Sequence, residues 1–71
     1  MKITGTIVHE ELEGGFWGIV GDDDQKYRPV DALPSPLRLE GCRVEAEIEP
    51  VPGLSFAMWG RNVRVLTLKR L

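Results

Sequence analysis

Residues 12–29 read LEGGFWGIVGDDDQKYRP, and this stretch predicts a β-hairpin. Residues 16–20 are apolar and aromatic, as strands are, and residues 25–28 resume the chain as a further strand. Between them lie Gly21 and three aspartates, which tolerate the unusual backbone angles of tight hairpins. Pro29 cannot donate a ladder hydrogen bond, so it ends the pairing.

Alternation of apolar and polar residues extends on both sides of this hairpin. The clearest case is residues 42–49, where apolar side chains alternate with Arg43 and glutamates, so that one face is buried and the other wet. β-Branched residues predict an earlier strand at residues 2–8, with Gly5 indicating a bend, a bulge or a close backbone approach. A final strand is expected at residues 54–59 and 62–68, interrupted at Gly60-Arg61.

The connection at residues 30–41 contains Pro34 and Pro36, which allow at most one helical turn, around residues 31–33. The pattern therefore predicts an all-β fold. We expect a five-stranded antiparallel barrel with a short helical or irregular insert between strands 3 and 4.

Length and composition limit the classes of protein that this chain can belong to. Its 71 residues suffice for one domain, expected over residues 1–71. The lone Cys42 cannot form an internal disulfide, and Cys42 with the lone His9 cannot fill a tetrahedral zinc site. We find no signal-peptide pattern and no apolar run of membrane-spanning length, so a cytoplasmic protein is expected.

The order of three strands, a short insert and two more strands is that of the OB-fold. The chain resembles cold-shock-type OB domains over roughly residues 3–49. Residues 15–19 (GFWGI) look like that family's glycine–aromatic second strand, residues 27–33 its second aromatic strand and following turn, and residues 39–47 its glycine-led fourth strand. The resemblance implies an OB-like barrel and a face that stacks single-stranded bases on several aromatic side chains.

A second resemblance covers nearly the whole chain. The motif LEGGFWGIVGDD at residues 12–23 and MWG at residues 58–60 look like those of a group of short uncharacterised prokaryotic proteins. This resemblance implies the same barrel and brings no activity with it.

Nucleic-acid binding is disfavoured by charge, because the formal net charge is −2 where such binders normally carry excess lysine and arginine. Strand alternation also separates the aromatics, since Phe16 and Trp17 must point to opposite faces. Tyr27, across the hairpin, is the expected source of a second ring on the binding face.

The chemistry-bearing residues favour ordinary structural roles over catalysis. Asp22, Asp23 and Asp24 are interpreted as a solvated hairpin tip rather than a cation site. The acidic loop that begins at His9 lies on the order of 20 Å from them, at the other end of the second strand. Cys42 is expected to be a buried, inert thiol. The chain offers no nucleophile triad, paired carboxylates at usable spacing or phosphate-binding loop, so we expect a protein that is not an enzyme and needs no cofactor or metal.

Trp17 and Trp59 are open to two interpretations, as core residues or as part of an exposed aromatic patch. The end of the chain is basic, from Arg61 to Arg70, which indicates either a solvated edge or a docking patch. In the last strand Val63 and Val65 point one way and Leu66 and Leu68 the other. Coverage by another subunit would explain aliphatics on both faces.

These observations favour a non-enzymatic binding or interaction module whose partner is an unknown protein or small ligand, acting through the face of strands 2 and 3. The alternatives are single-stranded nucleic acid at the same face, and a structural homo-oligomer, such as a homodimer built through the last strand. No membrane partner is expected. The candidate binding residues are Phe16, Trp17, Tyr27, Arg28, Trp59 and Arg61.

Overall fold

The computed structural model describes residues 1–51 and 59–71, apart from the side chain of Glu13. The elements in chain order are β1 (Lys2–Glu10), the 3-10 turn η1 (Leu12–Gly14), β2 (Phe16–Gly21), β3 (Lys26–Pro29), the 3-10 turn η2 (Ser35–Leu37), β4 (Arg43–Pro50) and β5 (Arg61–Arg70). The strand expected at residues 54–59 lies outside the described residues except for Trp59, which is in a bend. Within the described parts, none of the helices has the length and apolar character needed to cross a membrane.

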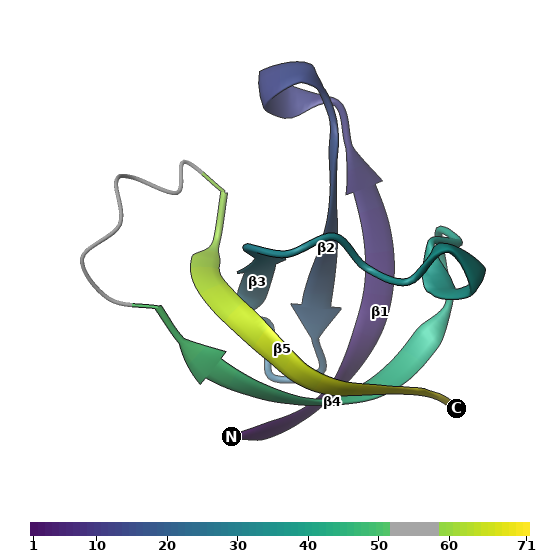
Figure 1. Ribbon diagram of the computed structural model, residues 1–71, viewed down its shortest axis with the longest axis vertical. Helices are drawn as coiled ribbons and strands as arrows, with labels where there is room; N and C mark the ends of the chain where they lie inside the picture. Colours follow the sequence, from purple (N-terminus) through teal and green to yellow (C-terminus); the bar gives the residue numbers. More distant parts are fainter. Residues whose placement is uncertain (52–58) are drawn as a thin grey trace.

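The five strands close into a barrel in the order β1-β2-β3-β5-β4, with β1 paired to both β2 and β4 (Figure 1). An all-β, five-stranded barrel is therefore confirmed. The expectation that all its strands are antiparallel is wrong, because β3 and β5 run parallel over residues 27–29 and 61–63. Neighbours around a closed ring can alternate in direction only if their number is even. A ring of five strands must therefore contain at least one parallel pair.

Gly5 marks the close backbone approach that its place within a strand predicts. It lies opposite Gly21 on β2 and opposite Val44 on β4, at the point where β1 bonds to both neighbours. A Cβ on Gly5 would lie 2.5 Å from the carbonyl oxygen of Val20. Only glycine fits here, because nearly any side chain would push β1 and β2 apart.

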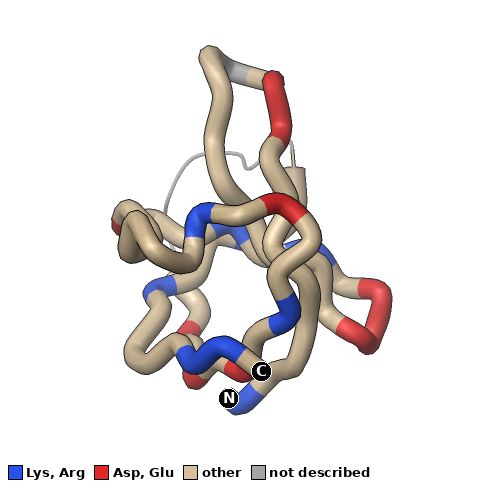
Figure 2. The backbone as a smooth tube through the Cα atoms, turned by 90° about the vertical axis from the view of Figure 1, so that its right-hand side faces the viewer, with Lys and Arg blue, Asp and Glu red and all other residues tan. Residues whose placement is uncertain are grey.

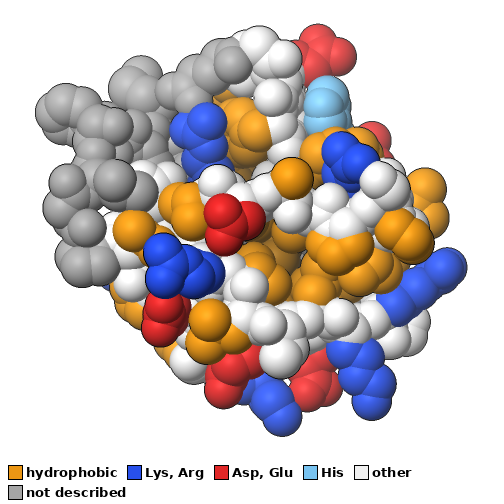
Figure 3. Space-filling view, in the orientation of Figure 1, with side chains coloured by type: hydrophobic (Ala, Val, Ile, Leu, Met, Phe, Trp, Pro, Cys, Tyr) orange, Lys and Arg blue, Asp and Glu red, His pale blue; other side chains and the backbone are white. Residues whose placement is uncertain are grey.

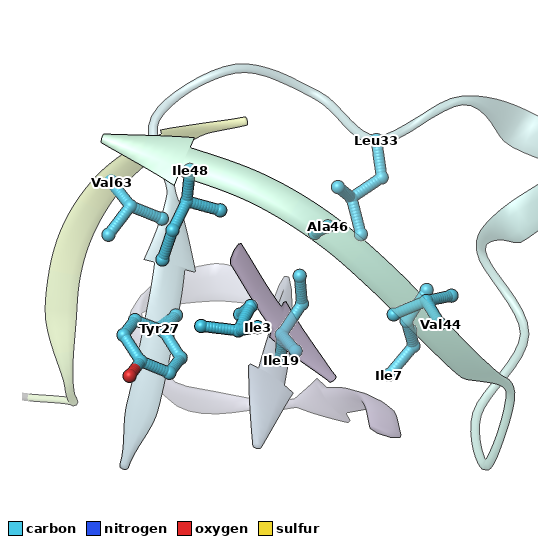
Figure 4. Packing of buried hydrophobic residues seen from close by; sticks show 9 residues of the cluster. All are labelled: Ile3, Ile7, Ile19, Tyr27, Leu33, Val44, Ala46, Ile48 and Val63. Atoms are coloured by element: carbon cyan, nitrogen blue, oxygen red, sulfur yellow. The ribbon is translucent and has the colours of Figure 1, made fainter. Parts of the chain in front are cut away.

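The barrel interior is filled by inward residues of the strands and by one residue of the connection between β3 and β4 (Figure 4). That residue is Leu33, which is 5% exposed. The buried cluster comprises Ile3, Ile7, Ile19, Tyr27, Leu33, Val44, Ala46, Ile48 and Val63.

Tyr27 belongs to this core and is only 2% exposed, so it does not lie on the outer face of the hairpin where the sequence placed it. The pairing register gives the reason. Tyr27 lies directly opposite Ile19, and residues that face each other across an antiparallel pair point to the same side of the sheet. Ile19 is fully buried, so Tyr27 must point inward as well.

A β-bulge in β5 explains why both faces of this strand seemed to carry aliphatics. Val65 lies opposite Ile48 and Thr67 opposite Glu47, which leaves Leu66 as an extra residue. One extra residue reverses the alternation, so that Val63, Val65 and Leu68 all pack on the core. Leu66 is 52% exposed. The pattern thus has an explanation within one chain, without a covering subunit.

The connection between β3 and β4 contains a single 3-10 turn at Ser35–Leu37, and the turn expected at residues 31–33 is absent. Pro36 lies in the first turn of η2, where a missing backbone N–H costs no helical hydrogen bond. Cys42 precedes β4 and is half-buried against the core rather than fully buried.

Candidate ligand-binding surface

The candidate surface is the outer face of β2 and β3. Ile19 and Tyr27 point into the barrel, so their neighbours on each strand must point outward. These outward residues are Phe16, Gly18 and Val20 on β2 and Lys26 and Arg28 on β3. This face therefore combines the aromatic ring of Phe16, the cations of Lys26 and Arg28, and a space at Gly18, which has no side chain.

Trp59 fills the gap at Gly18 from a distant part of the chain. A Cβ on Gly18 would collide with the six-membered part of the Trp59 indole. The Trp59 and Phe16 rings pack edge to face, with centroids 5.3 Å apart and planes at 68°. Trp59 is 6% exposed, so it stabilises the fold as well as supplying a second ring on this face.

Two cations cover these rings. Arg28 Cζ lies 4.4 Å from the centroid of the Phe16 ring, and Lys26 Nζ lies 5.5 Å from that of Trp59. Both distances fall within the range of attractive cation–π contacts. We call Phe16, Lys26, Arg28 and Trp59 the aromatic–cation cluster.

A hollow of about 230 Å³ adjoins this cluster where β2 begins. Its lining comprises Phe16, Trp17, Pro29, Val30, Asp31, Ala32, Leu33 and Arg38. Arg38 adds a third cation beside Phe16, and Asp31 is the acidic residue in the lining. The hollow is mainly apolar with charges at its rim, as small-ligand sites often are.

Trp17 points away from the outer face, as alternation predicts, and packs against the core while lining the hollow. Its ring lies 4.8 Å from that of His9 at an interplanar angle of 57°. Trp17 can therefore contact a ligand in the hollow, but not one that lies over Gly18 on the outer face.

Arg61 lies beside Tyr27 in the parallel pair with β3. Paired residues in a sheet point to the same side, so Arg61 projects to the side opposite Arg28. The structure thus brings together Phe16, Arg28 and Trp59 among the predicted site residues and separates Tyr27 and Arg61 from them, while Trp17 reaches only the adjoining hollow, beside Phe16. Sequence reasoning missed Lys26, although its alternation with Arg28 was the available signal.

The aspartates at the β2–β3 turn have structural roles. Asp22 accepts two hydrogen bonds from the Arg43 guanidinium, both 2.7 Å long. These bonds lower the pKa of Asp22. Asp24 has a φ of +66°, the left-handed conformation that aspartate tolerates at turns.

Asp23 ties the turn to the core. It accepts a hydrogen bond from the Gln25 backbone N–H at 3.0 Å and one from the Tyr27 hydroxyl at 2.8 Å. The Gln25 bond, followed by the Tyr27 bond, lowers the pKa of Asp23. Burial, followed by the bond to Asp23, raises the pKa of Tyr27. Asp23 thus satisfies the one polar group that Tyr27 brings toward the core.

The acidic residues that flank β2 form two separate groups, as the sequence predicts. Red segments lie at both ends of the β1–β2–β3 meander in Figure 2, at the turn after β2 and where β1 ends. Among the described residues, no group of three or more His, Cys, Asp or Glu side chains is arranged to hold a metal ion.

Comparison of the chain with protein-family models, curated proteins and solved structures gives no match in any of the three. Neither resemblance drawn from the sequence is therefore supported by a family match.

Proposed function

We propose that the protein is a non-enzymatic binding module of OB-like fold whose ligand-binding surface is the outer face of β2 and β3. The ring order β1-β2-β3-β5-β4, with its parallel β3–β5 pair, supports the OB-like assignment. In OB-folds the face of strands 2 and 3 is the one that binds oligonucleotides and oligosaccharides.

The aromatic–cation cluster is the observation that carries this proposal. Lys26 is exposed and Arg28 half-exposed, so both cations remain accessible above their rings. A planar group can stack on the Arg28 guanidinium or replace it on Phe16, while a negative charge pairs with the cations. The ligand that fits best is therefore a small molecule, or a segment of a protein, that carries a planar ring beside negative charge.

Single-stranded nucleic acid is the second candidate, and the cations beside Phe16 favour it. Phe16 is the ring on which a base can stack, a contact that contributes about 1–3 kcal/mol per base, whereas Trp59 is 6% exposed and supports Phe16 edge to face. Three cations, Lys26, Arg28 and Arg38, lie on or beside the surface. With about three phosphates neutralised, log K should fall with log salt at a slope of about 2.

A structural homo-oligomer remains as a third proposal with less support. The argument for it was the pair of aliphatic faces on the last strand, and the bulge at Leu66 accounts for those within one chain. Sedimentation at several protein concentrations measures the oligomeric state directly.

The proposed function is tested by titrating the protein with adenosine monophosphate and with a short single-stranded oligothymidine. The Trp17→Phe background leaves Trp59 as the fluorescent reporter, and amide chemical shifts locate the contacts. We expect both ligands to shift the resonances of Phe16, Lys26 and Arg28 and to change Trp59 emission. The oligonucleotide alone should show the salt slope described above.

The matched variants are Arg28→Gln and Lys26→Gln, with Lys69→Gln as a control that removes the same charge from β5. The first two should weaken binding at least tenfold and the control should leave it unchanged. Equal weakening by all three would mean non-specific charge attraction. An absence of shifts at millimolar ligand would remove ring-bearing anions from consideration.

A further inference from the structure

A second binding site is suggested by the edge of β5 that faces away from β4. β5 runs over Arg61–Arg70, but β3 pairs with it only at residues 61–63. The last backbone bond on that side runs from the Val30 N–H to the Val63 carbonyl, at 2.9 Å. From Arg64 onward, no described strand pairs with this edge (Figure 1).

The pairing register shows which backbone groups this edge presents. Ile48 uses its N–H and C=O to bond Met1, so both groups point away from β5. Val65, directly opposite Ile48, is therefore in a non-hydrogen-bonded pair and must point its own N–H and C=O away from β4. Leu68, opposite Ala46, is in the same position. Both residues thus present donors and acceptors at the open edge.

These groups face a hollow of about 240 Å³ between β5 and the connection after β3. Figure 3 shows apolar side chains gathered around the depression in the middle of this face. One wall consists of Val65, Leu66, Thr67 and Leu68, and the other of Asp31, Ala32, Leu33 and Pro34. The site therefore combines strand-pairing groups that no described strand uses with a pocket for an apolar side chain.

The positive charge of β5 indicates which kind of partner fits this edge. β5 contains four basic residues and no acidic one: Arg61, Arg64, Lys69 and Arg70. Arg64 pairs with Glu49 at 3.3 Å, and Lys69 and Arg70 are exposed and directly follow Leu68, which lines the hollow. In an antiparallel pair with a second copy of β5 centred on residues 65–68, Lys69 and Arg70 of each copy would lie near Arg64 of the other and repel it. An acidic partner has no such penalty.

We propose that the open edge of β5 at Val65 and Leu68 binds an extended acidic peptide segment of another protein by strand addition. The backbone of the peptide bonds to the edge, an apolar side chain enters the hollow, and flanking acidic residues pair with Lys69 and Arg70. Main-chain bonds provide affinity and the pocket provides specificity in this mode of recognition. Lysines on edge strands can instead serve to discourage strand pairing. The experiment must therefore distinguish basic residues that prevent pairing from basic residues that bind a partner.

The probe is a synthetic heptapeptide of alternating valine and threonine with a glutamate at each end. A second peptide has lysines in place of the glutamates, and a third has N-methyl groups on the amides of one edge. Amide shifts and hydrogen exchange of Val65 and Leu68 report binding. We expect fast exchange of both amides in the free protein and slowed exchange with the glutamate peptide. The lysine and N-methylated peptides should bind at least tenfold more weakly.

Charge reversal keeps the test independent of folding. The double variant Lys69→Glu, Arg70→Glu should lose the glutamate peptide and gain the lysine peptide, while Lys26→Gln should change neither. Failure of the glutamate peptide to perturb the edge at millimolar concentration would overturn the proposal. So would equal binding of all three peptides, or a dimer in which the Val65 and Leu68 amides are protected without peptide.

Discussion

At the scale of single residues, two small features determine how the outer and inner faces of the hairpin are used. Gly18 leaves room for the Trp59 indole on the outer face, so the second ring of the aromatic–cation cluster depends on an absent side chain. On the inner face, Asp23 accepts the Tyr27 hydroxyl and allows this tyrosine to serve as a core residue. Alternation along a strand predicts neither partnership.

Substitution Gly18→Ala should displace Trp59, because the added Cβ collides with the indole. Overpacking of this kind costs about 1–3 kcal/mol of unfolding free energy, measured by urea denaturation. In a Trp59→Leu background the same substitution should cost markedly less. Equal costs in both backgrounds would mean that the loss comes from the strand backbone and not from the ring.

Substitution Tyr27→Phe should lower the unfolding free energy by about 0.5–1.5 kcal/mol, the usual net contribution of one hydrogen bond. The reason is that the phenylalanine keeps the packing in the core but no longer donates to Asp23. A double-mutant cycle with Asp23→Ala, which removes the acceptor, isolates this pair. A coupling energy near zero would show that Asp23 acts mainly through the Gln25 backbone.

At the scale of elements, one extra residue in β5 allows aliphatic residues that do not alternate regularly to face the barrel core. Its aliphatics change face at Leu66, and the bulge at that position returns Leu68 to the core. The same strand pairs with β3 at its start and leaves its later edge open. The first residues of β5 thus close the barrel, while its later residues leave an edge with which no described strand pairs.

Deletion of Leu66 should preserve a cooperatively folded protein. Without Leu66, simple alternation keeps Val63, Val65 and Leu68 on the inner face. Deletion of Glu45 is the matched control, because it forces Val44 and Ala46 onto opposite faces and should unfold the protein. Thermal and urea unfolding compare the two. An unfolded Leu66 deletion would mean that barrel closure needs the bend made by the bulge.

At the scale of the whole molecule, the turn after β2 is attached to β4 and to the core by carboxylates. Asp22 bonds Arg43, and Asp23 bonds Tyr27. Arg43 also donates to Thr6 on β1, at 3.1 Å. One guanidinium therefore links β1, β4 and the β2–β3 turn at one end of the barrel.

Stability should fall in acid because of these carboxylates. Folding lowers the pKa of Asp22, through Arg43, and that of Asp23, through Gln25 and then Tyr27. The unfolded chain therefore binds more protons below its own aspartate pKa of about 3.9. The contribution to stability is complete above that value and is lost as the pH falls through the folded values. The double variant Asp22→Asn, Asp23→Asn should have a flatter profile in urea unfolding between about pH 2 and about pH 6. An unchanged slope would assign the acid sensitivity to other carboxylates.

The aromatic–cation cluster could be predicted only in part. Phe16 and Arg28 follow from the hairpin, because outward residues on adjacent strands are close in sequence. Trp59 lies far along the chain, and nothing local pairs it with Gly18. Tyr27 was assigned to the wrong face because it was sought as a second stacking ring, although its alternation with Lys26 and Arg28 already indicated that it points inward.

The amino-acid sequence by itself determined where the strands lie, because side chains alternate along a strand and leave a local pattern of period two. It also determined that the prolines exclude a long helix between β3 and β4, and it limited Gly5 to a bend, a bulge or a close backbone approach. Only the tertiary structure decided the parallel pair that closes the ring, the bulge at Leu66 and the ring partner of Phe16. Each of these depends on the register between strands distant in sequence, and register is set by packing the whole barrel at once.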